Sequence, residues 1–195
     1  SLKQQISETQ NLIVGFNQWG GKYIEESKQI LKILSTNLIT TCSGVKILYP
    51  GYNSGAWGGC KETDIQYYTP AFFRIFAKVS GDEIWNQLAD DSYIVLNASA
   101  NAETGLVPDW QTANGIGLPP SYRTAYFRYD ACRVPWRMSL DYLWNGNEKA
   151  KTWCTTISNW AFKVGPANIN DGYNLDGTPN NGGNHNSAFV GGLAV

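Results

Sequence analysis

The sequence has little of what metal chemistry and binding to charged partners require. It contains one histidine among 195 residues, charged residues make up 16%, and Lys and Arg form no cluster. A single histidine excludes a metal site built from several histidines, and the cysteine spacings of a zinc site are absent. Without a basic patch, the field that draws proteins to nucleic acid or anionic membranes is lacking. We therefore expect no cofactor, no metal and no nucleic-acid partner.

Long apolar runs are also missing, and none reaches the roughly 18 residues that a membrane span needs. We expect a monomer that does not interact with membranes. The chain begins at Ser1 and stops at Val195 inside the apolar run "SAFVGGLAV", which has the pattern of an unfinished helix. Residues 1–195 are therefore expected to form a single domain, and a partial one.

Cysteine is scarce, with four residues in two groups. Cys42 and Cys60 flank one Gly-, Tyr- and Trp-rich loop, where a disulfide and a pair of free thiols remain equal alternatives. Cys132 and Cys154 lie at unequal distances from a turn at Gly146, which argues against a bridge. We predict that these two are buried thiols.

Aromatic residues are abundant instead, with eight Trp and eleven Tyr. Three segments share one design, in which a helical pattern ends at a glycine and a second helical pattern follows. The glycines, Gly20, Gly81 and Gly146, lie about 60 residues apart. Glycine suits the left-handed conformation that often ends a helix. The sequence therefore predicts three antiparallel helix pairs.

The connections between these pairs, residues 40–66, 98–124 and 165–186, are longer than is usual between packed helices. Because the turns at the glycines are short, all three connections must emerge at one end of the pairs. They carry Trp and Tyr rings together with Asn, Asp and Gly. Such a surface is typical of a sugar-binding groove, where rings stack on sugar faces and polar groups meet hydroxyls.

Helix pairs in series predict an all-α fold, either an open α/α solenoid or a closed α/α toroid. Three pairs cannot close a six-pair ring, which favours an incomplete portion of a toroid. A self-contained helical bundle with decorated loops is the alternative.

Asp130 has the strongest candidate chemistry. Pro135 is tolerated only in the first turn of a helix, so the helix should start around residues 131–134. Asp130 could then be a simple N-cap. However, Arg133 and the positive end of the helix favour an ionised carboxylate that could act as a base on water. We also expect an ion pair between Arg137 and Asp141 that orients Arg133.

The sequence resembles glycoside hydrolase family 8 from about Gln18 to its end. The stretches that carry the resemblance, in chain order, are "YYTPAFFRIFAKVSG", "SGDEIWNQLADDSY", "TGLVPDW", "YDACRVPWRMSLDYLWNGNEKAKTW" and "DGYNLDG…NHNSAFVG". The resemblance implies an (α/α)6 toroid and an inverting β-glycanase, most often an endo-1,4-β-glucanase. Xylanases, lichenases and chitosanases are relatives within that family.

The resemblance also implies roles for individual residues. Asp130 is the general base, Tyr129 and Arg133 border the water and the sugar, and Trp57 is a stacking platform. Tyr126 precedes the base on the loop face and is a further candidate for substrate contact. Trp110 either stacks on a sugar or packs a loop against a helix. The expected partner is a β-glucan or xylan chain.

The family's general acid is a glutamate from earlier helix pairs, and nothing in this sequence corresponds to it. Glu62, Asp64, Glu103 and Asp109 lie on the loop face, but none sits in a family acid motif. A non-catalytic glycan-binding toroid is therefore a second hypothesis, and a terpene-cyclase-like toroid is a weak third. For His185 we expect a structural hydrogen bond. We expect secretion, since polymer substrates are extracellular.

Overall fold

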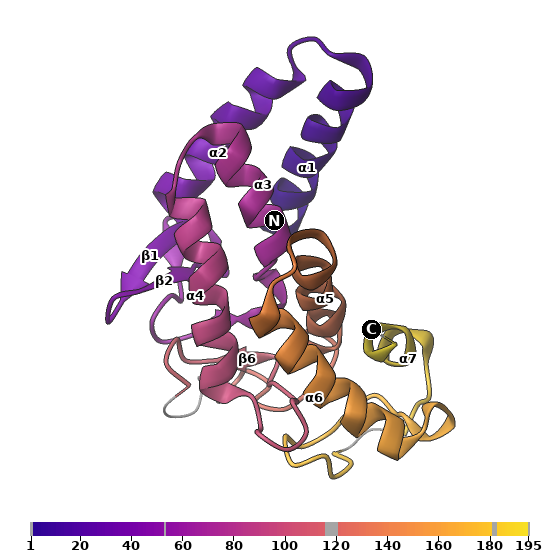
Figure 1. The fold of residues 1–195 in the computed structure, drawn as a ribbon. Coiled ribbons are helices and arrows are strands. Elements are labelled where there is room, and N and C mark those ends of the chain that lie inside the picture. The colour runs from indigo at the N-terminus through magenta and orange to yellow at the C-terminus, as the bar shows by residue number, and fades with distance from the viewer. Residues whose placement is uncertain (1, 53, 116–120, 181–182, 195) are drawn as a thin grey trace.

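The computed structural model describes residues 2–52, 54–115, 121–180 and 183–194. Helices dominate this part of the chain. They are α1 (Leu2–Trp19), α2 (Tyr23–Leu38), α3 (Pro70–Ser80), α4 (Ile84–Ser99), α5 (Val134–Asn145), α6 (Glu148–Val164) and α7 (Ser187–Leu193). The first six pack as three consecutive hairpins, α1 with α2, α3 with α4 and α5 with α6 (Figure 1). The predicted helix pairs are confirmed.

Glycine makes each of the three hairpin turns. Gly20, Gly81 and Gly146 have φ angles of 67°, 71° and 65°, the left-handed conformation that glycine adopts without steric cost. The Gly81 amide donates to the Ala77 carbonyl at 2.8 Å and so closes the last turn of α3. The local rule used on the sequence therefore holds at all three positions.

The long connections contain short antiparallel ribbons, which the all-α expectation did not include. The strands are β1 (Ile39–Cys42), β2 (Val45–Leu48), β3 (Gly51–Tyr52), β4 (Ala56–Trp57), β5 (Thr63–Asp64) and β6 (Trp110–Gln111). In the β5–β6 ribbon, Thr63 pairs with Gln111 and Asp64 with Trp110. This ribbon joins the first long connection to the second, and both lie in the lower half of Figure 1.

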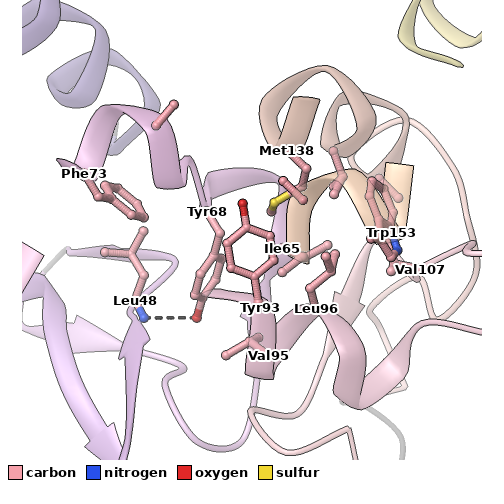
Figure 2. Close-up of a cluster of buried hydrophobic side chains, with 14 of the residues drawn as sticks. Leu48, Ile65, Tyr68, Phe73, Tyr93, Val95, Leu96, Val107, Met138 and Trp153 are labelled. Atoms are coloured by element: carbon pink, nitrogen blue, oxygen red, sulfur yellow. Dashed lines mark hydrogen bonds between the residues drawn. The ribbon is translucent and has the colours of Figure 1, made fainter. Parts of the chain in front are cut away.

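The core lies between α3, α4 and α5 and extends under the loops. Phe76 and Trp85 pack edge to face across the α3–α4 pair, with ring centroids 5.3 Å apart. Tyr68 is fully buried, and its hydroxyl accepts a hydrogen bond from the Leu48 amide at 3.0 Å (Figure 2). This contact fixes the first connection against the helices, so the loop face rests on a packed base.

The expected ion pair between Arg137 and Asp141 is wrong. Asp141 is fully buried and accepts hydrogen bonds from Arg74 Nε at 3.0 Å and from the Tyr93 hydroxyl at 2.7 Å. These donors come from α3 and α4, so the Asp141 carboxylate faces the neighbouring hairpin. Arg137 is also buried, and its Nε has no hydrogen-bond partner among the residues that the structure describes. Packing between hairpins outweighs the pairing that helical spacing predicts within α5.

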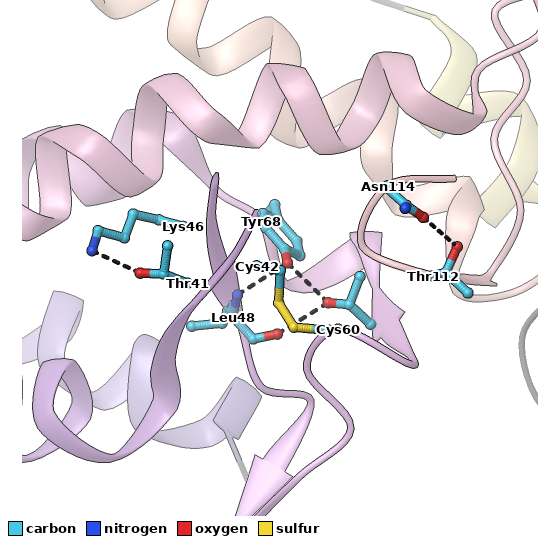
Figure 3. Close-up of a disulfide and its surroundings, with 9 residues drawn as sticks. Thr41, Cys42, Lys46, Leu48, Cys60, Tyr68, Thr112 and Asn114 are labelled. Carbon is cyan, nitrogen blue, oxygen red and sulfur yellow. Dashed lines mark hydrogen bonds between the residues drawn. A yellow bond between two sulfur atoms is a disulfide. The ribbon is translucent and has the colours of Figure 1, made fainter. Parts of the chain in front are cut away.

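A disulfide joins Cys42 to Cys60, which decides between the two alternatives left open by the sequence (Figure 3). It ties the β1–β2 ribbon to the loop that carries Trp57. Cys132 and Cys154 are buried free thiols, as predicted.

Within the described ranges, no helix is both long enough and apolar enough to cross a membrane. The same residues contain no group of three or more His, Cys, Asp or Glu side chains placed to hold a metal ion.

Candidate active site

Asp130 lies where the second long connection enters α5. A 3-10 turn, Ala131–Arg133, follows it, and Pro135 occupies the first turn of the helix, as predicted. The Asp130 side chain is 33% exposed and makes no capping hydrogen bond to the helix start. The N-cap interpretation is therefore wrong for its side chain, and the carboxylate remains accessible at the loop face.

Arg133 holds the Asp130 carboxylate, as expected. Its Nη1 lies 3.3 Å from Asp130 Oδ1 and 3.0 Å from Gln66 Oε1, and it also donates to the Tyr129 carbonyl. A guanidinium shared among three acceptors has little freedom to rotate. The carboxylate is therefore fixed in direction.

The support behind Arg133 was missed by sequence reasoning, which considered Asp64 only as an acid and did not single out Gln66. Asp64 is fully buried. Its two carboxyl oxygens accept hydrogen bonds from the Gln66 backbone nitrogen at 2.9 Å and from the side-chain nitrogen Gln66 Nε2 at 2.6 Å. Gln66 therefore turns its Oε1 toward Arg133. Burial, opposed by these bonds and reinforced by the charge of Asp130, raises the pKa of Asp64 to about 8. The only signal in the sequence was the position of "TDIQYY" just before α3.

Tyr67 is a second residue that sequence reasoning missed. Its side chain is half-buried, and burial is the main cause of the raised pKa of its hydroxyl. The negative charges of Asp64 and Asp130 are the next causes. Tyr67 therefore lies within electrostatic reach of the candidate base.

Tyr129 joins the base to the third long connection. Its hydroxyl donates to Asp171 Oδ2 at 2.6 Å, and its ring packs edge to face on Phe189 at 5.2 Å. Asp171 Oδ1 also accepts the backbone amides of Gly183 and Asn184. The ring of Tyr129, 45% exposed, is thus held at the edge of the site.

Trp57 and Trp110 form an aromatic pair on the loop face. Their rings are stacked, with centroids 6.1 Å apart and planes 22° from parallel. The Arg123 guanidinium lies over both rings, 3.8 Å from the Trp110 centroid and 5.1 Å from that of Trp57. Glu62 fixes Arg123 through an ion pair of 2.8 Å. We call Trp57, Trp110, Arg123 and Glu62 the aromatic platform.

The two tryptophans differ in how far they are covered. Arg123 lies closer to the ring of Trp110, which is half-buried, and Trp57 is 36% exposed. Contact of either ring with a sugar stays a prediction. Because Trp110 pairs with Asp64 in the β5–β6 ribbon, the platform is continuous with the Asp64–Gln66–Arg133 chain.

Tyr126 is placed mainly by its backbone. Its carbonyl accepts a hydrogen bond from the Asp109 amide at 3.0 Å, and its side chain is half-buried. The structure therefore puts Tyr126 on the segment that leads to Asp130, and its contact with substrate stays a prediction.

Three of the four loop-face carboxyls considered as acids hold other groups. Glu62 binds Arg123, Asp64 binds Gln66, and Asp109 accepts backbone amides at the start of the helix that follows Asp130. Glu103 is exposed in the turn after α4. The identity of the general acid stays a prediction. His185 makes the expected structural hydrogen bond, at 2.7 Å to the Ile169 carbonyl.

Comparison with known proteins gives one family. The model of "Glycosyl hydrolases family 8" matches residues 9–194. Endoglucanase 2 of Ruminiclostridium josui is 38% identical over 184 residues, which are 92% of this chain and 38% of that protein. Endoglucanase A of Acetivibrio thermocellus is 36% identical over 188 residues, 94% of this chain and 38% of that protein.

Solved structures with the same fold extend beyond this chain. A β-1,3-1,4-glucanase from Paenibacillus sp. X4 superposes with a TM-score of 0.81 at 23% identity, covering 99% of this chain and 55% of that one. A family 8 xylobiose complex from Teredinibacter turnerae has a TM-score of 0.74 at 24% identity, covering 92% and 51%. The chain thus spans about half the length of these structures and 38% of the curated relatives.

Proposed function

The chain belongs to glycosyl hydrolases family 8, with part of the (α/α)6 fold of that family's enzymes, and on this premise we propose that it carries the water-activating side of an inverting β-1,4-glycanase site. The observation that carries the proposal is the Asp130 carboxylate, accessible on the loop face and held by Arg133 at 3.3 Å. In an inverting enzyme, one carboxylate activates water on the face of the sugar opposite the leaving group. Asp130 is our candidate for that carboxylate.

The proposed reaction moves two protons. Asp130 takes a proton from a water molecule, whose oxygen forms a bond to the anomeric carbon. The glycosidic C–O bond breaks on the other side, and the leaving oxygen receives its proton from a general acid. That acid should lie about 6.5–9.5 Å from the base. We propose that it is the family's glutamate, to which no residue of these 195 corresponds.

The proposed substrate is a β-1,4-linked glucan bound along the loop face. Trp57 offers an exposed ring to the apolar face of a pyranose, and Tyr129 lies one residue before the base. The endoglucanases at 36–38% identity favour glucan. The xylanases among the structural neighbours make xylan the second choice, and chitosan is the third.

Secretion is part of the same proposal. The Cys42–Cys60 disulfide supports it, because such bonds persist mainly in oxidising surroundings outside the cytosol.

Glycan binding without hydrolysis is the second candidate function. It is favoured by the contacts of Glu62, Asp64 and Asp109, each of which holds a protein group. In that case Asp130 would bind a sugar hydroxyl, and no second carboxyl would be required.

Reducing-sugar release separates these functions. The assay compares the 195-residue chain with the same chain fused behind the segment that precedes the matched region in the R. josui endoglucanase. Carboxymethylcellulose, barley β-glucan, xylan and chitosan are the substrates. We expect turnover by the fusion, little or none by the chain alone, and a loss of about 10²- to 10⁴-fold in the Asp130→Asn fusion.

Glu103→Gln is the matched control, since it removes an exposed carboxyl of the same face without touching Asp130. It should leave the rate unchanged. A fusion that binds one of the polymers and cleaves none would replace the hydrolase proposal by glycan binding. Turnover by the chain alone would show that its own carboxyls include the acid.

A further inference from the structure

Asp109 lies directly behind the backbone of the candidate base. It precedes β6, it is only 4% exposed, and its Oδ1 accepts three backbone amides. The donors are the amides of Arg128 at 3.0 Å, Asp130 at 3.2 Å and Ala131 at 2.8 Å. One carboxyl oxygen thus holds the chain on both sides of Asp130 and at Asp130 itself.

These bonds hold the chain where it enters the helix. Asp130 occupies the cap position, but its side chain makes no capping bond. An N-cap side chain usually accepts the amide of the second or third helical residue. Here Cys132 and Arg133 donate those amides to the carbonyls of Arg128 and Asp130. Asp109, 21 residues before Asp130 in the chain, binds three amides at and around Asp130, and the Asp130 carboxylate takes part in none of these bonds.

Asp109 is itself on a fixed support. Its own amide donates to the Tyr126 carbonyl at 3.0 Å, and the next residue, Trp110, donates to the Thr124 carbonyl at 2.9 Å. Trp110 also pairs with Asp64 in the β5–β6 ribbon. The backbone of Asp109 is therefore held by two segments.

Burying the Asp109 carboxyl near other acidic groups is unfavourable, and its hydrogen bonds to the backbone amides offset part of this cost. Burial raises the pKa of Asp109 to about 6, and the charge of Asp130 acts in the same direction, while the three amides lower it. The negative charge of Asp109 in turn raises the pKa values of Asp64 and Cys132. A carboxyl that had no role in binding these amides would be better placed in water.

We propose that Asp109 is a positioning residue for the general base, one that fixes the backbone of residues 128–131 and so aims the Asp130 carboxylate at the attacking water. Its action as an aid to catalysis rests on the proposed function. Its action on the backbone does not, and it can be measured separately.

Amide NMR of the 195-residue chain tests the backbone part. The amide protons of Arg128, Asp130 and Ala131 should titrate together with a midpoint near pH 6, following Asp109. In an Asp130→Asn background, which removes a charge that raises the pKa of Asp109, the three amides should still titrate together, with a midpoint below 6. Asp64 and Cys132 titrate higher, at about 8 and about 11. In Asp109→Asn the common titration should vanish.

Asp176→Asn is the matched control, because Asp176 also accepts a backbone amide, that of Thr178 at 2.9 Å, in a separate turn. It should leave the amides of residues 128–131 unchanged. If these amides titrate the same way in Asp109→Asn as in the parent, the proposal is wrong. Asparagine keeps the size and one acceptor oxygen, so this variant serves even if Asp109→Ala does not fold.

Kinetics of the fusion described above test the catalytic part. We expect kcat to fall by about 10²-fold in Asp109→Ala, as for a reacting group misplaced by about 1 Å, with KM nearly unchanged. Asp109→Asn should recover part of this loss. A rise in KM with unchanged kcat would overturn the positioning role. If the fusion proves inactive with its native residues, the hydrolase proposal fails, while the NMR result still decides what Asp109 does.

Discussion

The Tyr129 hydroxyl donates a hydrogen bond of 2.6 Å to Asp171 Oδ2, across 42 residues of sequence. This bond joins the residue before the candidate base to the third long connection. Asp171 is almost fully buried and also accepts the amides of Gly183 and Asn184. The loop face is therefore a connected surface, and its parts should respond together when this bond is removed.

Asp171 should stabilise the fold most at neutral pH. The hydrogen bond from Tyr129, followed by those from Gly183 and Asn184, lowers the pKa of Asp171 below its usual range. A lowered carboxyl pKa gives stability that is present above the unfolded value of about 3.9 and lost as the pH falls toward the folded value. The difference in melting temperature between the parent and Asp171→Asn should thus be largest at neutral pH and should shrink as the pH falls below about 4. A difference that stays constant across this range would contradict the role of the ionised form.

Asp64 should have the opposite effect. Its pKa is raised to about 8, mainly by burial, so the folded chain holds a proton that the unfolded chain loses near pH 4. Its contribution to stability is complete below pH 4 and is lost as the pH rises toward 8. In denaturant unfolding, Asp64→Asn should remove this part of the decline between pH 5 and pH 8. Asp90→Asn, which removes an exposed carboxylate, is the control and should leave the slope unchanged.

Arg123 should matter for binding through the platform. Replacing it by Gln removes the cation over Trp57 and Trp110 and leaves the buried Glu62 without its ion-pair partner. We expect binding of a cello-oligosaccharide to weaken by at most roughly fivefold, since the cation–π contact that holds the Trp57 ring in place contributes about 1 kcal/mol. Isothermal titration calorimetry measures this. Lys78→Gln, in the last turn of α3, is the control, and an equal loss in both variants would point to charge alone.

The disulfide should stabilise the chain and hold the platform. Cys42→Ser or reduction should lower the free energy of unfolding by about 3 kcal/mol, as expected for a bridge across 18 residues. Because the bridged loop carries Trp57, oligosaccharide binding should weaken as well. Thermal melts with and without reductant, and calorimetry on the same samples, give both quantities. Cys154→Ser is the control: it removes a free thiol, so reductant should lower the stability of this variant by the same amount as that of the parent.

Much of the fold follows from local rules in the sequence. Gly20, Gly81 and Gly146 end helices because only the few residues around each turn decide the left-handed conformation. Pro135 marks the start of α5 for an equally local reason. Asp130 and Arg133 are three residues apart at this start, so their pairing also needs only local geometry.

The remaining features depend on contacts between distant segments. Asp109 holds the backbone at Asp130, Glu62 holds Arg123, and Asp141 turns to Arg74 instead of Arg137. Their partners lie 21, 61 and 67 residues away. A carboxylate takes whichever donors packing brings to it, because leaving a buried charge unpaired is costly. The sequence by itself thus determined the helix pairs and the position of Asp130 at the start of α5, and the tertiary structure decided which distant donors each of these buried acids binds.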